Sequence, residues 1–193
     1  MLGDEFLRLA FTNHEGRPEH VRVQPVLQEL ADRFRETAHY AVLDGRSVVY
    51  RAKVDPSTGA VRLTSVVGGR NPAHSTAVGK LMLSHALPDS GAVHSWVAAS
   101  PELERRTERT IVDAGKLAVE LEKIRTQGFA TEEQENEIGI SCLAVPIYLT
   151  SPSTPVGAIS ISALDYRTPI TSLVEALPEI QQIVASLGSR GGA

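Results

Sequence analysis

The feature that most constrains the fold is a pair of β-rich runs that flank an Asp-Gly turn. Val and Tyr recur in residues 38–43 and 47–52, and Asp44-Gly45-Arg46 lies between the two runs. An Asp-Gly pair supplies the positive φ angle that a short hairpin loop requires. The sequence therefore predicts a β-hairpin, and a hairpin favours an antiparallel sheet.

Further strands are predicted on both sides of the middle of the chain. Apolar and polar residues alternate over 61–67, which extends the first hairpin into a meander, and residues 129–131 begin another strand ahead of an acidic loop. Two long runs, 140–149 and 156–163, flank a turn rich in Pro and Ser. They are expected to form a second hairpin.

Helical periodicity marks the remaining segments. Helices are predicted over 25–36, from a start near residue 74, between Asp113 and Gly128, and over 171–187, with short helices within 88–112. Pro25 suits a first helical turn, and Ser75 or Thr76 can cap the second helix. Gly128 is a candidate for a left-handed cap that ends the third helix.

The order of these elements predicts the fold class. A helix, three strands, helices, then strands and a helix favour an α+β fold in which helices cover an antiparallel sheet. The chain is not an alternating βαβ sequence. A phosphate-binding loop around Gly79-Lys80 is excluded, because His74 and Leu81 stand where that motif needs a glycine and a hydroxyl.

Composition limits the classes of partner. The net charge of −4 argues against this chain gripping a nucleic-acid backbone by itself, since that needs clustered, uncompensated Lys and Arg. A lone cysteine, Cys142, excludes an internal disulfide and fits a reducing compartment, so a cytoplasmic location is expected. The longest apolar runs fall short of the about 18 residues of a membrane span, and no membrane partner is expected.

Several stretches, taken in order, resemble one known family. They include Leu27-Gln28-Glu29-Leu30-Ala31, Ala41-Val42-Leu43-Asp44-Gly45, His74-Ser75-Thr76-Ala77-Val78-Gly79-Lys80, Gly139-Ile140-Ser141-Cys142-Leu143-Ala144-Val145-Pro146 and Ala158-Ile159-Ser160-Ile161-Ser162. Together with the helix that ends at Gly128-Phe129-Ala130, they cover nearly the whole chain. This chain resembles the effector-binding domain of IclR-type (isocitrate lyase regulator type) bacterial transcription factors.

The resemblance implies a fold, a function and partners. The fold would be GAF-like, an antiparallel β-sheet flanked by helices, and the domain would sense a small metabolite such as a carboxylate or aromatic acid. The family implies a homodimer or homotetramer that represses or activates transcription. DNA would be contacted through a winged helix-turn-helix absent from this chain, because Met1 stands just before the Leu-Gly that follows the wing. The expected division is a connector of helix and loop (1–20), the effector-binding domain (21–188) and a flexible tail (189–193).

The resemblance also places an effector site at Ser75, Thr76, Ala77, Glu132, Cys142, Ser160 and Ser162. Free backbone N–H groups at the start of the helix after Ser75 suit an anion. Ser160 and Ser162 stand two apart on a strand, so both hydroxyls face one side. These donors would suffice for a carboxylate without a cation, and Glu132 would then bond a ligand hydroxyl or turn outward.

Each of these residues has a plainer interpretation. The two serines could bond neighbouring groups of the protein, a lone strand cysteine is commonly an inert core residue, and Glu132 could belong to a solvated acidic loop. His74 is expected to orient its loop rather than bind a metal, because no second histidine stands three or four residues away. No metal or cofactor is expected.

Two other functions compete with the sensor. One is an oligomerisation module without a ligand, and the other is an enzyme with Cys142 as nucleophile, which requires a base within hydrogen-bond reach. No such Cys-His-Asp arrangement is identifiable, so catalysis is not expected. Self-association is expected for the sensor and for the oligomerisation module. The apolar helical face of Leu173, Leu177 and Ile180 is expected to be larger than the core of one chain can bury.

Overall fold

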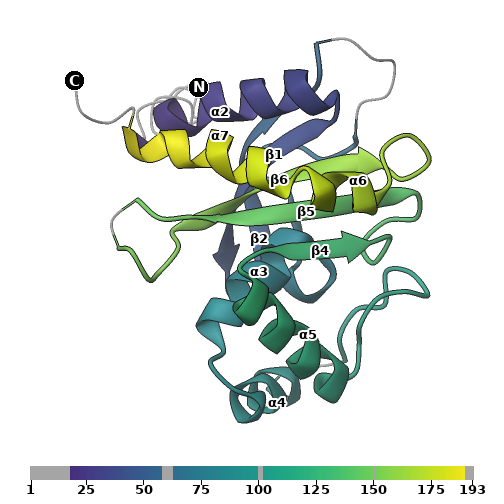
Figure 1. Ribbon diagram of the computed structural model, residues 1–193. Helices are drawn as coiled ribbons and strands as arrows, with labels where there is room; N and C mark the ends of the chain where they lie inside the picture. The colour runs from purple at the N-terminus through teal and green to yellow at the C-terminus, as the bar shows by residue number, and fades with distance from the viewer. Residues whose placement is uncertain (1–17, 58–62, 100–101, 150, 190–193) are drawn as a thin grey trace, which may run out of the picture.

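The computed structural model describes residues 18–57, 63–99, 102–149 and 151–189, and these residues are built on a six-stranded sheet (Figure 1). The strand order is β3-β2-β1-β6-β5-β4, and every neighbouring pair is antiparallel. The predicted α+β class, an antiparallel sheet flanked by helices, is confirmed. The expectations for residues 1–17, for Val61 and for the last four residues of the tail lie outside the described residues. The strands are β1 (Thr37–Asp44), β2 (Ser47–Val54), β3 (Arg70–Pro72), β4 (Ala130–Glu133), β5 (Ile140–Ile147) and β6 (Gly157–Leu164).

Both predicted hairpins are present. Strands β1 and β2 pair down to Asp44 opposite Ser47, and Gly45 takes a φ of 63° in the loop. Strands β5 and β6 form the second hairpin. Because β1 also pairs with β6, the two hairpins join at the centre of the sheet, where His39 lies opposite Ser160.

The predicted third strand over 61–67 is wrong for its described part. Residues 63–69 are irregular, and the strand that pairs with β2 is the short β3. Two contacts hold the irregular course: Lys53 Nζ donates to the carbonyl oxygens of Leu63 and Ser65, at 2.7 and 2.9 Å. The Gly68 N–H donates to the Tyr50 carbonyl at 2.8 Å, with Gly68 at a φ of 84°. Such a glycine bends the chain and postpones regular pairing.

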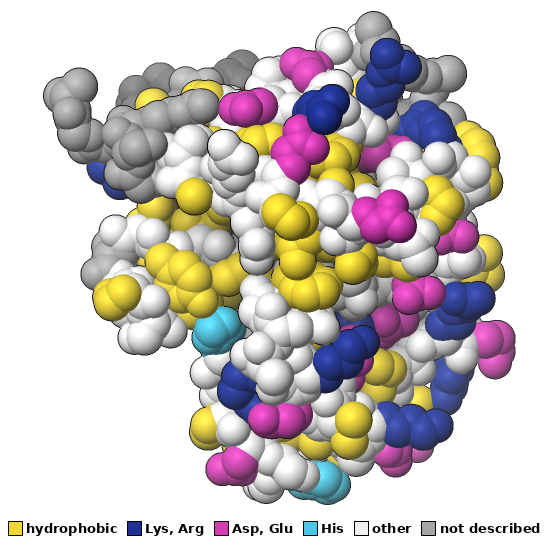
Figure 2. All heavy atoms as spheres, in the orientation of Figure 1, with side chains coloured by type: hydrophobic (Ala, Val, Ile, Leu, Met, Phe, Trp, Pro, Cys, Tyr) yellow, Lys and Arg dark blue, Asp and Glu magenta, His cyan; other side chains and the backbone are white. Residues whose placement is uncertain are grey.

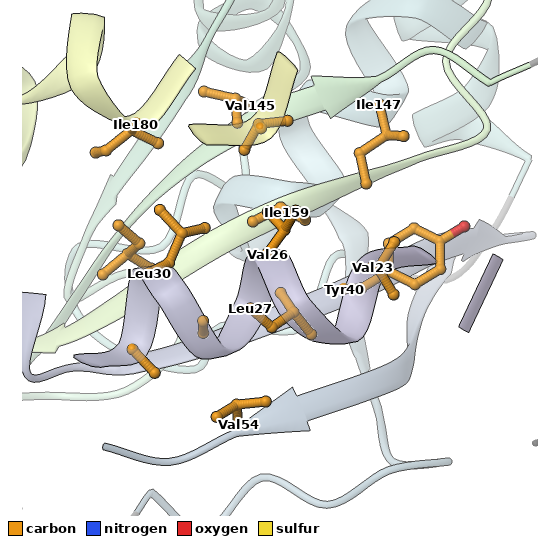
Figure 3. Close-up of a cluster of buried hydrophobic side chains, with 14 of the residues drawn as sticks. Val23, Val26, Leu27, Leu30, Tyr40, Val54, Val145, Ile147, Ile159 and Ile180 are labelled. Carbon is orange, nitrogen blue, oxygen red and sulfur yellow. The ribbon is translucent and has the colours of Figure 1, made fainter. Parts of the chain in front are cut away.

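Helices α2 (Pro18–Phe34), α6 (Ile170–Glu175) and α7 (Leu177–Ser189) cover one face of the sheet, with α2 and α7 side by side in Figure 1. The helix expected from Pro25 begins instead at Pro18, so Pro25 lies inside it. An interior proline costs roughly 3 kcal/mol. Figure 3 shows why the helix persists: Val23, Val26 and Leu27 are fully buried against the sheet, and each such burial contributes about 1.5–3 kcal/mol.

The single helix expected over 171–187 is two helices separated at Ala176. Pro178 has no N–H to donate and stands in the first turn of α7, where a proline is tolerated. The helical face proposed for self-association lies largely against the core of the same chain. Leu173 and Ile180 are 0 % and 1 % exposed and pack into the chain's own core, with Leu177 partly buried against it, so most of this face is covered within one chain.

The opposite face of the sheet carries the 3₁₀ turn η1 (Ala73–Ser75), then α3 (Ala77–Ala86), α4 (Ser90–Ala98) and α5 (Ala114–Gln127). Thr76 caps α3, as one of the two candidates predicted, and Asp113 caps α5. Gly128 ends α5 at a φ of 79°, which confirms its predicted role. Leu117, Leu121 and Ile124 are all fully buried in this second core.

The face of the molecule drawn in Figure 2 carries charges of both signs. Figure 2 shows Lys and Arg interspersed with Asp and Glu on the helical layers, so this face carries no stripe of one sign. Within the described ranges, no helix is both long enough and apolar enough to cross a membrane.

Candidate functional site

A cavity of about 230 Å³ lies between the sheet and the start of α3, and we call it the α3 pocket. The six strands of the sheet, the start of α3 and three loops contribute to its wall. The lining residues are His39, Tyr50, Leu63, Thr64, Ser65, Val66, Gly69, Arg70, Asn71, Thr76, Ala77, Val78, Arg106, Glu132, Asn136, Glu137, Ile140, Cys142, Ser160 and Ser162.

The structure brings together six of the seven residues proposed from the sequence: Thr76, Ala77, Glu132, Cys142, Ser160 and Ser162 all line the α3 pocket. Ser75 does not. It is fully buried in η1, where its hydroxyl donates to the Asn136 side-chain oxygen at 3.1 Å and to the Pro72 carbonyl at 3.2 Å. Ser75 therefore holds the loop of Asn136 against the start of α3 rather than facing the cavity.

The start of α3 presents backbone donors to the pocket. The Thr76 hydroxyl accepts the Gly79 N–H at 3.0 Å, which leaves the N–H groups of Ala77 and Val78 without acceptors inside the helix. Both residues line the cavity. A helix N-terminus carries a partial positive charge, so this wall of the pocket favours an anion.

The two serines differ. Ser162 is engaged within the protein: its hydroxyl oxygen accepts from the Cys142 thiol at 3.2 Å and lies 3.2 Å from His39 Nδ1. No hydrogen bond within the described part of the chain engages the Ser160 hydroxyl, which also faces the cavity. The plainer interpretation, bonding inside the protein, thus holds for Ser162, and Ser160 is the hydroxyl left for a ligand.

His39 connects Ser162 to the loop of residues 63–69, and we call the pair of His39 and Ser162 the polar floor of the α3 pocket. The His39 Nε2 lies 2.8 Å from the Ser65 hydroxyl, and burial lowers the pKa of the ring to about 3. The neutral ring has one donor and one acceptor nitrogen, and both are used, by Ser65 and Ser162. His39 therefore fixes the wall rather than carrying a charge.

Cys142 lacks the properties of a nucleophile. Burial raises the pKa of its thiol well above the ordinary range, and the nearby Glu132 carboxyl acts in the same direction. A nucleophilic cysteine needs the thiolate, which a positive neighbour or a base would favour. The structure places Cys142 as a protonated wall residue.

Glu132 points inward, and the interpretation as a solvated loop residue is wrong for it. The residue is 2 % exposed, and its Oε2 accepts the Glu135 N–H at 2.8 Å. Burial raises the pKa of the carboxyl to about 7. Near neutral pH this group is therefore divided between its charged and protonated forms.

A buried ion cluster of Lys80, Glu120 and Glu135, which sequence reasoning missed, lies next to Glu132 on the side away from the cavity. Lys80 is 1 % exposed, and its Nζ lies 2.5 Å from Glu135 Oε1 and 3.0 Å from Glu120 Oε1. The Glu135 carbonyl accepts from the hydroxyl of Thr110 at 2.6 Å. The cluster joins α3, α5 and the loop that follows β4, and it fixes the backbone N–H that holds Glu132.

Two guanidinium groups also line the pocket, those of Arg70 and Arg106, which the expected donor set did not include. Arg70 pairs with Asp44 at 2.6 Å, and Arg106 with Glu104 at 3.1 Å. Arg70 begins the short strand β3 and Arg106 stands in the loop before α5, and no spacing in the sequence indicates either as a pocket residue. His74 does orient its loop, through a contact of 2.9 Å between its Nε2 and the Glu104 carbonyl. Among the described residues, no group of three His, Cys, Asp or Glu side chains could hold a metal.

The fold is of the GAF-like class, an antiparallel sheet with flanking helices, and it carries a small polar cavity on one face. The chain belongs to the IclR family: the family model described as bacterial transcriptional regulator IclR C-terminal matches residues 20–188. The predicted family is confirmed.

Its relatives are transcriptional regulators. The chain is 38% identical over 122 residues to the HTH-type transcriptional regulator KdgR of Escherichia coli, covering 63% of this chain and 45% of KdgR. It is 34% identical over 161 residues to the Pca regulon regulatory protein of Pseudomonas putida, covering 78% and 53%. The chain thus spans about half the length of these curated relatives.

Solved structures agree with the sequence comparison. The Thermotoga maritima IclR has a TM-score of 0.82 at 27% identity, covering 98% of this chain and 74% of that chain. The inducer-binding domain of the PobR transcription factor from Acinetobacter, solved as a double mutant with 3-hydroxybenzoic acid, has a TM-score of 0.75 at 26% identity, covering 86% and 95%. The named relatives are regulators and not enzymes, in agreement with the expectation that this chain is not a catalyst.

Proposed function

We propose that this chain is the ligand-sensing domain of an IclR-type transcriptional regulator and that it binds a small organic anion in the α3 pocket. The observation that carries the proposal is the pairing of a helix start with an unengaged hydroxyl in one buried cavity. Ala77 and Val78 offer backbone N–H groups, and Ser160 offers its hydroxyl from the opposite wall. A carboxylate matches both.

The size and charge of the pocket narrow the ligand. A cavity of about 230 Å³ is smaller than the roughly 300–1,000 Å³ of sites for drug-sized molecules, so it suits a metabolite of a few carbon atoms or a single ring. Arg70 and Arg106 add positive charge at its edge. The neighbour bound to 3-hydroxybenzoic acid supports an acid of this size.

Regulation would follow from a change in assembly. In this proposal the domain forms a homodimer or homotetramer, and a ligand shifts its geometry by binding one arrangement more tightly than another. DNA is contacted by a winged helix-turn-helix outside this chain, and the protein acts in the cytoplasm, where the DNA is. The competing oligomerisation module without a ligand is less well supported, because the side chains of the described residues leave a cavity of about 230 Å³.

The proposal is tested by calorimetry and thermal shift with 3-hydroxybenzoate, benzoate and pyruvate. In the Ser160→Val variant, a donor is lost and the cavity is partly filled, which should weaken binding by about 1–3 kcal/mol, or roughly 5- to 150-fold. The fold should survive because Val suits a strand. Ser47→Val, on β2 and outside the pocket, is the matched control. Unchanged affinity in a Ser160→Val protein that melts normally would place the ligand elsewhere.

A further inference from the structure

The α3 pocket holds an acidic group where an anion is expected to bind. The Glu132 carboxyl is buried in the same small cavity as the start of α3. One of its oxygens accepts from the Glu135 N–H at 2.8 Å, a contact that favours the inward position of the carboxyl, and the residue is 2 % exposed. A ligand carboxylate in the pocket must therefore lie within a few ångströms of a second carboxyl group.

We propose that Glu132 makes anion binding proton-linked: its carboxyl takes up a proton from solvent as a carboxylate enters the α3 pocket. This inference rests on the proposed function. The step is a protonation only, in which the O–H bond formed on Glu132 offsets the added negative charge. The protonated carboxyl also gains a donor, which can point to the ligand.

The surroundings of Glu132 favour uptake by this group over others. The charged and titratable groups that face it are Cys142 from β5, Glu135 and Glu137 from the loop after β4, Lys80 from α3, Tyr50 from β2, His39 from β1, Arg70 from β3 and Arg106 from the loop before α5. Lys80 is held by two carboxylates, and each arginine by one. The His39 ring and the Cys142 thiol are neutral. The Glu132 carboxyl, buried in the wall beside the start of α3 and with a pKa raised to about 7 by burial, is placed to take up a proton near neutral pH.

The size of the linkage follows from the repulsion of two like charges. At a separation of about 6 Å and an effective dielectric constant of about 20, that repulsion corresponds to roughly two pKa units, or about a hundredfold in affinity. Bound ligand would thus raise the pKa of Glu132 to about 9. Affinity for a monocarboxylate should then fall more than about tenfold from pH 6.5 to pH 8.5, while the ligand itself stays ionised.

Calorimetry with benzoate and pyruvate tests this. The heat of binding near pH 8 is measured in phosphate and in Tris, whose protonation enthalpies differ, and it should report uptake of most of one proton. Glu132→Gln keeps the acceptor for the Glu135 N–H and should bind with no proton uptake and with an affinity that does not depend on pH. Glu133→Gln is the matched control, because its side chain is 55 % exposed and pairs with Arg109 outside the pocket. It should retain the uptake.

Each other outcome overturns part of the reasoning. Binding without proton uptake would overturn the linkage and leave the proposed function standing. Uptake that persists in Glu132→Gln would overturn its assignment to Glu132. If neither acid bound at any pH from about 6.5 to 8.5 while the protein melted cooperatively, the proposed function would fail and the linkage with it.

Discussion

Removing the charge of Lys80 should strongly destabilise the fold. Lys80→Met keeps most of the buried side-chain volume but leaves the Glu135 carboxylate, whose side chain is 11 % exposed, without its partner at 2.5 Å. The second oxygen of Glu135 is buried without a hydrogen bond, so the remaining charge has little other compensation. Breaking one side of a buried pair costs about 3–5 kcal/mol. Of a typical stability of about 5–15 kcal/mol, this is a large share.

Urea denaturation measures this loss, with Lys116→Met on the exposed face of α5 as the control. Burial raises the pKa of Glu135, and loss of Lys80 should raise it further, so the difference from the wild type should shrink as the pH falls and Glu135 takes a proton. The double variant Lys80→Met, Glu135→Gln should recover most of the stability. A loss under about 1 kcal/mol at pH 7, or a double variant no more stable than the single, would refute the reasoning.

Three other predictions concern stability and assembly. Gly79→Ala should lower the free energy of unfolding, measured in urea, by about 1–3 kcal/mol, because its Cβ would lie 2.1 Å from the Ala73 carbonyl oxygen. This clash outweighs the roughly 1 kcal/mol by which Ala favours a helix over Gly. A stabilised variant would contradict the prediction. As the pH falls from 7.5 to 5, His39, with its pKa lowered to about 3, should reduce the free energy of unfolding by about 2 kcal/mol, because the ring takes up a proton only in the unfolded chain. Glu132, with its pKa raised to about 7, should increase it by a similar amount, because the carboxyl takes up a proton in the folded protein first. Glu132→Gln should therefore lose stability toward acid where the wild type stays nearly level. Equal slopes would count against the Glu132 shift, and a variant that stays level would count against the His39 shift. In sedimentation the chain should self-associate, and a monomer mass independent of concentration would contradict this expectation.

Local chemistry predicted the elements whose causes are local. The Asp44-Gly45 hairpin and the helix between Asp113 and Gly128 form as expected, because turn residues, caps and periodicity act within a few positions. The strand expected over 61–67 failed because Lys53 and Tyr50 bind that backbone from another strand. Apolar and polar residues do alternate in this segment, but tertiary contacts outweigh the strand preference that the alternation indicates.

The candidate site divides in the same way. Six residues assigned through the family resemblance line the α3 pocket, while the buried cluster and the polar floor were not foreseen. Lys80 and Glu135 are 55 residues apart, and His39 and Ser162 are 123 apart. Only the pairing of β1 with β6 and the packing of α3 bring them together, and no spacing in the sequence encodes either.

Strand β6 separates the apolar core under α2 and α7 from the polar α3 pocket. Ile159 and Ile161 point toward α2 and α7 in the apolar core, and Ser160 and Ser162 point into the α3 pocket. Side chains alternate along a strand, so a slip of one residue would turn two hydroxyls into the apolar core and two isoleucines into the pocket. The register of β6 is thus specified from both sides, and an insertion or deletion inside this strand would damage the core and the pocket at once.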